Sequence, residues 1–104
     1  MSKNIAQDIA QKYVDKLRDE NFSFSEVYLF GSQVKGDSYK WSDIDIAIIT
    51  DEIKEEGDKK RLKLWKMREK IDDRIEPHPI TIDEFEQDWS PLVYEIKNTG
   101  IKVV

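Results

Sequence analysis

Residues 27–49 read VYLFGSQVKGDSYKWSDIDIAII, two apolar runs separated by a polar segment that opens with a glycine-serine pair. The first run predicts a strand that ends at Gly31, with a tight turn or helix beginning at Ser32. The second run predicts another strand, and Asp43 and Asp45 stand at its start. Because residues two apart on a strand point to the same side, both carboxylates are expected to face the turn between the two runs.

This arrangement is typical of a site for a divalent metal and a triphosphate. Magnesium is held by one or two carboxylates together with substrate phosphates, and two aspartates on one strand face can bridge a pair of ions. Glycine lets the backbone approach a phosphate closely, and the amides that open a helix receive an anion. A third carboxylate is expected from a neighbouring strand, and Glu76 is the only acidic residue within residues 74–80. Without a cation these three acids would repel one another.

Each part of the constellation also has a simpler structural interpretation. Taken alone, Gly31 and Ser32 are typical of a strand-to-helix turn with a serine cap. Glu76 alone is typical of an acidic residue at a sheet edge. His78, the only histidine, lies between two prolines, and we expect it to be a packed or surface residue rather than a base.

The sequence does not decide which other side chains contact the nucleotide. The basic residues with the reach to meet a triphosphate tail are Lys35, Lys40 and Arg61. Tyr39 and Trp41 precede the aspartates, and they either cover a nucleotide base or pack within the fold.

The apolar spacing along the chain predicts an α+β fold, a small mixed sheet with helices packed on one side. The expected strands are residues 25–30, 44–50 and 74–80. The expected helices are residues 5–17, 61–71 and 91–98, with a further short helix opened by a capping box at residues 81–84. Residues 51–60 are expected to form a charged loop, and residues 101–104 are expected to extend the sheet or to dock on a partner. Leu62, Trp65 and Ile71 are expected in the core. Pro77 and Pro79 place their strand at an edge of the sheet, because proline donates no backbone hydrogen bond.

Composition limits the class of protein further. A length of 104 residues predicts one domain spanning residues 1–104. A formal charge of −5, from 22 acidic and 17 basic residues, argues against stable nucleic-acid binding by this chain alone. The absence of cysteine excludes disulfides and thiol catalysis. No signal peptide or apolar run of membrane-spanning length is found, so we expect a cytoplasmic protein with no membrane contact.

Residues 30–32 (Phe-Gly-Ser) and 42–45 (Ser-Asp-Ile-Asp) resemble the nucleotidyltransferase motif of the DNA polymerase beta superfamily. The spacing of the glycine-serine pair and the two aspartates resembles that of the minimal nucleotidyltransferase (MNT) branch. The match covers residues 27–50, about a quarter of the chain, with Glu76 as an outlying third member. Glutamate stands there where the superfamily more often has aspartate.

The resemblance implies a polymerase-beta-like palm in which Gly31 and Ser32 contact the β- and γ-phosphates of ATP. It assigns Asp43 and Asp45 to Mg²⁺, with two ions expected, and Glu76 to the third metal-ligand position beside the attacking hydroxyl. MNT proteins are commonly partnered with HEPN-domain ribonuclease toxins, and several transfer AMP from ATP to a tyrosine of the toxin. The resemblance therefore implies a metal-dependent nucleotidyltransferase that acts as an antitoxin and moves AMP, or another nucleoside monophosphate, onto a HEPN toxin.

The length of the chain bears on the acceptor. The expected sheet, its helices and a metal site use nearly all of the 104 residues, which leaves little room for an acceptor pocket. We therefore expect the acceptor hydroxyl on another protein, with a homo- or hetero-oligomer left open. Two alternatives remain: a non-catalytic antitoxin that blocks its partner sterically, and an aminoglycoside-type transferase acting on a small molecule, whose pocket a second subunit would complete.

Overall fold

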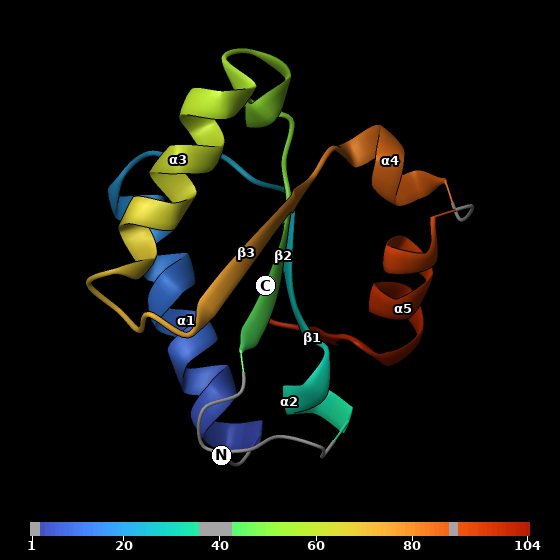
Figure 1. Ribbon diagram of the computed structural model, residues 1–104. Coiled ribbons are helices and arrows are strands. Elements are labelled where there is room, and N and C mark those ends of the chain that lie inside the picture. Colours follow the sequence, from blue (N-terminus) through green and yellow to red (C-terminus); the bar gives the residue numbers. More distant parts are fainter. Residues whose placement is uncertain (1–2, 36–42, 88–89) are drawn as a thin grey trace.

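A four-stranded sheet, with strand order β3-β2-β1-β4, organises the chain (Figure 1). The computed structural model describes residues 3–35, 43–87 and 90–104. In chain order the elements are α1 (Lys3–Asp19), β1 (Glu26–Phe30), α2 (Ser32–Lys35), β2 (Ile44–Ile49), the 3₁₀ helix η1 (Glu52–Lys54), α3 (Gly57–Arg68), β3 (Ile75–Ile80), α4 (Ile82–Glu86), α5 (Pro91–Thr99) and β4 (Ile101–Lys102). None of the described helices is both long enough and apolar enough to cross a bilayer.

The sheet is mixed, as the sequence predicts. β1 pairs antiparallel with β2 and with β4, whereas β2 and β3 run parallel. The tail that follows α5 continues the sheet as β4, which is one of the two outcomes expected for residues 101–104. The predicted α+β class is confirmed.

Helices cover both faces of the sheet rather than the one side expected. On one face, alternate residues of β2 (Ile44, Ile46 and Ile48) join a core cluster with residues of α1 and α3. On the other face, Ala47 and Ile49 join a second cluster with residues of α4 and α5. Figure 1 shows the two helix pairs on opposite sides of the strands. Because β2 is apolar on both faces after Asp45, burying this strand requires a helical layer on each side of the sheet.

The charged segment after β2 contains more helix than predicted. It was expected to be a loop over residues 51–60, but it holds η1, and α3 already begins at Gly57. The predicted helix over residues 61–71 ends earlier, at Arg68. Few apolar residues mark the first turn of α3, so its start carries no periodic signal.

The buried side of α3 also differs from the prediction. Leu64 and Met67 face the core, whereas Leu62 is 53% exposed and Trp65 is 42% exposed. The exposed Trp65 ring lies 4.1 Å from the guanidinium carbon of Arg68, which covers part of it. Two apolar rows run along this helix, and packing against α1 and the sheet selects the row that contains Leu64.

β3 lies at the edge of the sheet, as its two prolines predict. The backbone N–H of Ile44 donates to the carbonyl of Arg74 (2.9 Å), so the even-numbered residues of β3 turn their backbone polar groups toward β2. Pro77 and Pro79 therefore turn toward the open edge. The ladder with β2 loses no hydrogen bond to either proline.

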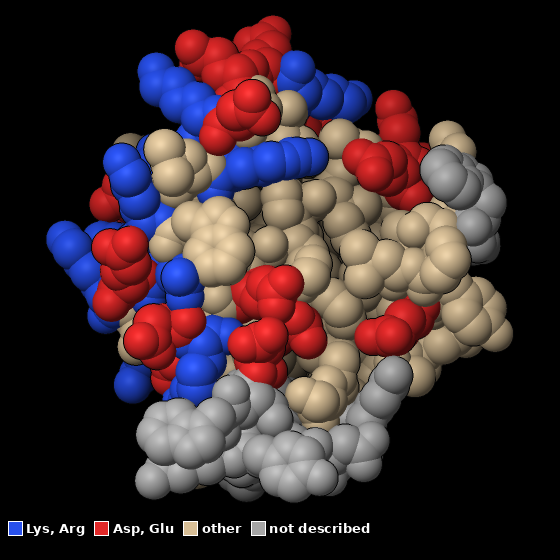
Figure 2. Space-filling view, viewed as in Figure 1, with Lys and Arg blue, Asp and Glu red and all other residues tan. Residues whose placement is uncertain are grey.

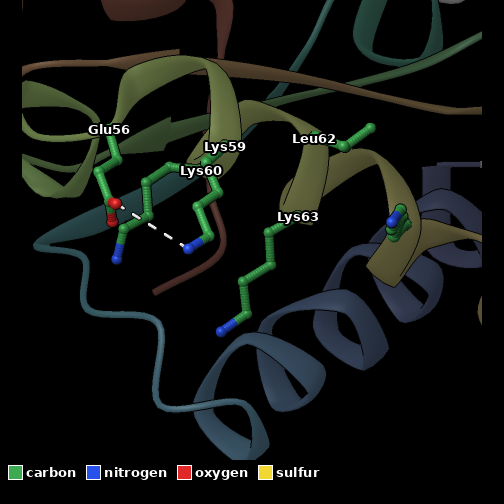
Figure 3. Close-up of a pocket in the computed structure, with 6 residues that line it drawn as sticks. Glu56, Lys59, Lys60, Leu62 and Lys63 are labelled. Carbon is green, nitrogen blue, oxygen red and sulfur yellow. Dashed lines mark ion pairs between the residues drawn. The ribbon is translucent and has the colours of Figure 1, made fainter.

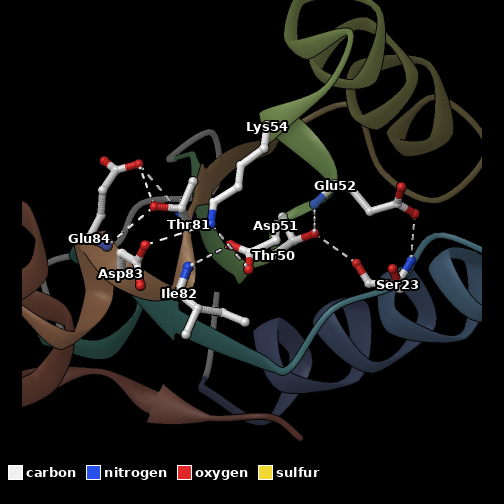
Figure 4. Close-up of polar contacts among 9 residues, drawn as sticks. All are labelled: Ser23, Thr50, Asp51, Glu52, Lys54, Thr81, Ile82, Asp83 and Glu84. Carbon is white, nitrogen blue, oxygen red and sulfur yellow. Dashed lines mark hydrogen bonds and ion pairs between the residues drawn. The ribbon is translucent and has the colours of Figure 1, made fainter.

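Side chains join the end of β2 to the start of α4 (Figure 4). Asp51 Oδ1 accepts a hydrogen bond from the backbone N–H of Ile82 (3.1 Å). Thr81 Oγ1 accepts from the N–H of Glu84 (3.2 Å), and the Glu84 carboxylate accepts from the N–H of Thr81. The capping box predicted at 81–84 is thus confirmed, and it directs α4 across the second core cluster.

Candidate functional site

The starts of β2 and β3 bring the predicted acidic residues together. Asp45 is paired in register with Glu76 on β3 and with Phe30 on β1. Asp43 directly precedes β2, and its carboxyl group shares a hydrogen bond with that of Glu76. Acidic side chains gather over this end of the sheet in the space-filling view (Figure 2). The expected approach of a third carboxylate from a neighbouring strand is found.

Gly31 lies against the Asp45 side chain. Its φ of +82° belongs to the left-handed region that favours glycine. A Cβ atom at this position would also collide with Oδ2 of Asp45. Glycine is therefore needed both for the turn out of β1 and for the space that the Asp45 carboxylate occupies.

Ser32 follows as the first residue of α2 and is partly buried. The N–H of Val34 donates to the carbonyl of Gly31 (3.1 Å), which closes the turn that the sequence predicts. Ser32 is thus adjacent to the residue that touches Asp45, and its contact with a phosphate stays a prediction.

His78 also belongs to this cluster, where it is packed, as expected, and also meets the acidic side chains. Its Nε2 lies 3.1 Å from Oδ1 of Asp45 and 4.0 Å from Oε1 of Glu76. Its ring also packs edge-on against Phe30, with 5.1 Å between the ring centroids. The signal for this placement was present in the sequence: Glu76 and His78 are two residues apart on a strand, the same spacing as the two aspartates.

The donor set fits a cation. One ligand atom from each of Asp45, Glu76 and His78 lies within 4.8 Å of the other two. The two carboxylates suit a hard divalent ion of the magnesium or manganese class, whereas an imidazole is a more typical ligand of zinc, iron, copper or nickel. The Asp43 carboxyl group adds a further oxygen beside Glu76.

The electrostatics of the cluster point the same way. Burial raises the pKa of the Glu76 carboxyl group, and the hydrogen bond to Asp43 and the charge of Asp45 raise it further. His78 acts in the opposite direction. Without a cation, ionised Glu76 therefore carries a free-energy cost that a bound divalent ion would relieve.

The remaining candidates have different placements. The side chain of Lys35 and all of Tyr39, Lys40 and Trp41 lie outside the part of the chain that the structure describes. Arg61 lies on α3, which packs on the sheet face opposite to the one that carries Asp45 and Ala47. The structure does not bring Arg61 to the acidic cluster.

A separate hollow lies along α3 (Figure 3). It is lined by Glu56, Leu62 and four lysines, Lys59, Lys60, Lys63 and Lys66. Glu56 forms an ion pair with Lys59 (3.9 Å). Because α3 covers the other face of the sheet, this hollow is not part of the acidic cluster.

Sequence comparison identifies the family. Residues 10–103 match the nucleotidyltransferase domain. The chain belongs to the nucleotidyltransferase domain family. The match extends well beyond the glycine-serine and aspartate motif and includes all four strands of this nucleotidyltransferase domain. A comparison with curated proteins finds no match.

Solved structures share the fold of this nucleotidyltransferase domain. A toxin-antitoxin crystallised with AMP-PNP matches with a TM-score of 0.67 and 23% identity, over 90% of this chain and 71% of that chain. A candidate nucleotidyltransferase from Sulfolobus solfataricus matches with a TM-score of 0.67 and 21% identity, over 96% and 80% of the two chains. A mutant of the toxin-antitoxin MntA-HpeT matches with a TM-score of 0.61 and 20% identity, over 100% and 73%. These likenesses support the predicted nucleotidyltransferase fold.

Proposed function

We propose that this domain is an antitoxin that transfers AMP from ATP to a hydroxyl group of its toxin. The observation that carries the proposal is the meeting of Asp43, Asp45 and Glu76 beside Gly31, in a chain of the nucleotidyltransferase domain family. Two of the similar structures are toxin-antitoxin proteins, and one of these holds the ATP analogue AMP-PNP. The MNT resemblance adds the finer expectation that the toxin is a HEPN-type ribonuclease.

The site residues divide into two groups by their chemistry. Asp43, Asp45 and Glu76 provide the carboxylate oxygens for Mg²⁺, with two ions expected. Bound Mg²⁺ would neutralise the charge of the triphosphate and of the reacting phosphoryl group. Gly31 and Ser32 leave room for the β- and γ-phosphates and offer backbone and hydroxyl donors to them.

The reaction forms one bond and breaks another at the α-phosphorus of ATP. The acceptor hydroxyl oxygen attacks this phosphorus, and the bond to the oxygen that bridges the α- and β-phosphates breaks. Pyrophosphate leaves on the side of Gly31 and Ser32. The hydroxyl proton passes to the carboxylate of Glu76, beside which the acceptor is held. Asp45 and Glu76 keep acceptor and nucleotide oriented, which supplies much of the rate.

A protein acceptor is favoured by the exposure of the acidic cluster. The acidic cluster lies at one end of the sheet, and its side chains are only partly buried, so a partner can present a hydroxyl there.

The transfer itself can be measured with ATP labelled at the α-phosphate. Incubated with Mg²⁺ and the protein encoded beside it, the domain should label that protein, whereas ATP labelled at the γ-phosphate should not. Asp43→Asn and Asp45→Asn should each reduce labelling at least about 100-fold with the fold retained, because each removes a metal ligand at nearly constant volume. Unlabelled partner in a tight complex that survives both substitutions would instead indicate a steric antitoxin. Label on a small molecule without any partner would indicate the aminoglycoside-type activity.

Ser32→Ala tests the phosphate contact. If the hydroxyl donates to a charged phosphate, its loss should weaken binding of AMP-PNP roughly 10-fold or more, as measured by calorimetry. Ser90→Ala is the matched control, because Ser90 caps α5 and its oxygen accepts from the N–H of Val93. Unchanged affinity in Ser32→Ala would leave Ser32 as a turn residue only.

A further inference from the structure

We propose that His78 is a positioning residue that holds the Asp45 carboxylate in the orientation that binds the cation. The inference rests on the proposed function, since it concerns the metal site of that reaction. His78 itself need not touch the ion.

The Asp45 carboxylate is constrained at both of its oxygens. Oδ2 lies where a Cβ atom of residue 31 would otherwise be, so it rests directly against the Gly31 backbone. Oδ1 lies 3.1 Å from Nε2 of His78, within hydrogen-bond distance. Turning the carboxylate about its side-chain torsions would break the contact with His78, and the Gly31 backbone limits movement on the other side.

The imidazole is itself held in place. Its ring packs edge-on against Phe30, and its backbone is paired in register with Ala47 of β2. The His78 side chain is 26% exposed, so it is neither a free surface group nor fully enclosed. A donor that is held by strand pairing and ring packing can order a carboxylate at little additional cost in side-chain entropy.

The two prolines of β3 also favour the backbone conformation of the site residues. Glu76 precedes Pro77, and His78 precedes Pro79. The residue before a proline is sterically biased away from helix toward extended backbone. Both site residues of β3 are therefore biased toward the strand conformation that points their side chains to the same face as Asp45. The alternation Glu-Pro-His-Pro thus serves the site as well as the edge of the sheet.

The hydrogen bond leaves the carboxylate able to bind a cation. Because a carboxylate oxygen only accepts, this contact requires the proton on Nε2, which donates to one lone pair of Oδ1. The other lone pairs of Asp45 stay available as ligands. Partners of this kind, which hydrogen-bond to a ligating group, change metal affinity by about 10- to 100-fold when removed.

The test compares variants that keep or remove the donor. His78→Phe keeps a ring against Phe30 but has no N–H, whereas His78→Gln places an amide donor at a similar reach. We expect His78→Phe to weaken Mn²⁺ binding in the presence of AMP-PNP at least about 10-fold, and His78→Gln to retain it within about 3-fold. Free Mn²⁺ is counted by electron paramagnetic resonance. Thr50→Val is the control, because it removes a side-chain hydrogen bond to the Ser23 carbonyl (2.7 Å) just beyond the far end of β2.

Three results would overturn the inference. The first is Mn²⁺ binding by His78→Phe that is as tight as in the unsubstituted protein, and the second is binding by His78→Gln that is as weak as in His78→Phe. Spin-echo spectra of bound Mn²⁺ that show a directly coordinated nitrogen would make His78 a ligand instead. If His78→Phe does not fold, His78→Asn replaces it, because its shorter amide does not reach Asp45. If the unsubstituted protein does not bind Mn²⁺, both this inference and the proposed function are overturned. If every variant binds Mn²⁺ as the unsubstituted protein does, only this inference is overturned.

Discussion

Gly31 carries two separate constraints, and Gly31→Ala is expected to reveal both. An alanine at a φ of +82° should lower the free energy of unfolding by about 1–3 kcal/mol. The added Cβ would also displace the flexible end of Asp45, so Mn²⁺ binding should weaken together with stability. Urea denaturation and Mn²⁺ titration measure the two effects.

Gly57→Ala is the matched control for that substitution. A Cβ at Gly57 meets no other atom within 4 Å, and the residue opens α3. Alanine there should change the free energy of unfolding by no more than about 1 kcal/mol and leave Mn²⁺ binding unchanged. Equal behaviour of the two alanine variants would contradict the role assigned to Gly31.

Glu76→Gln should stabilise the metal-free protein at a pH above neutrality. Because burial, Asp43 and Asp45 raise the pKa of Glu76, the folded state holds this proton more tightly than the unfolded chain does. Wild-type stability therefore falls as the pH rises from the unfolded pKa through the folded one. Glutamine avoids that loss, so the melting temperature should rise at about pH 8, and the gain should disappear near pH 3, where both states are protonated.

The same substitution should abolish stabilisation by Mn²⁺, because it removes a ligand. Glu55→Gln is the control, since Glu55 is an exposed carboxylate in the segment between η1 and α3. A pH-independent effect of Glu76→Gln would show that the carboxylates are not coupled in the folded protein.

At the scale of the elements, α3 offers a comparison between two leucines. Leu64 is fully buried, whereas Leu62 is 53% exposed. Leu64→Ala should lower the free energy of unfolding by about 2–5 kcal/mol, because it leaves a cavity in the core. Leu62→Ala should change it by about 0.5 kcal/mol or less. Equal costs in chemical denaturation would mean that both sides of α3 are covered in solution.

The elements show how far sequence patterns lead. The strands β1, β2 and β3 were predicted to within one residue, because each is an apolar run next to a turn or proline signal. The capping box at Thr81 was equally readable. The buried side of α3 could not be predicted from the sequence, because only the packing of α1 and the sheet distinguishes Leu64 from Leu62. The contact between His78 and Asp45 was missed although the two-residue spacing of Glu76 and His78 was readable, since Asp45 is distant in sequence and is brought close by strand pairing.

At the scale of the whole molecule, ligand binding should raise thermal stability. A ligand that binds only the folded state adds about 2.7 kcal/mol when its free concentration is 100 times its Kd. We expect Mn²⁺ with AMP-PNP to raise the melting temperature of the protein, and chelation of the metal to reverse the increase. Asp45→Asn should show no such increase. An identical increase in that variant would place the nucleotide elsewhere on the molecule.

The arrangement of the layers depends on the whole chain. Alternation along β2 correctly located the two faces of that strand and its polar start. It did not indicate which helix covers which face, because that depends on the path of the chain between strands. α1 and α3 lie on one face, and α4 and α5 lie on the other. The identity of the acceptor could not be predicted either, because no local sequence pattern encodes it.

The outer side of β3 has a consequence for how this protein meets other chains. Strands at a sheet border invite an incoming segment to add itself and extend the ladder, which is a common route to aggregates. Pro77 and Pro79 withdraw two of the amides that such a segment would need. Extension of the sheet is thereby blocked at the edge nearest the acidic cluster. Another protein that binds at this edge must do so through side chains instead of through backbone hydrogen bonds.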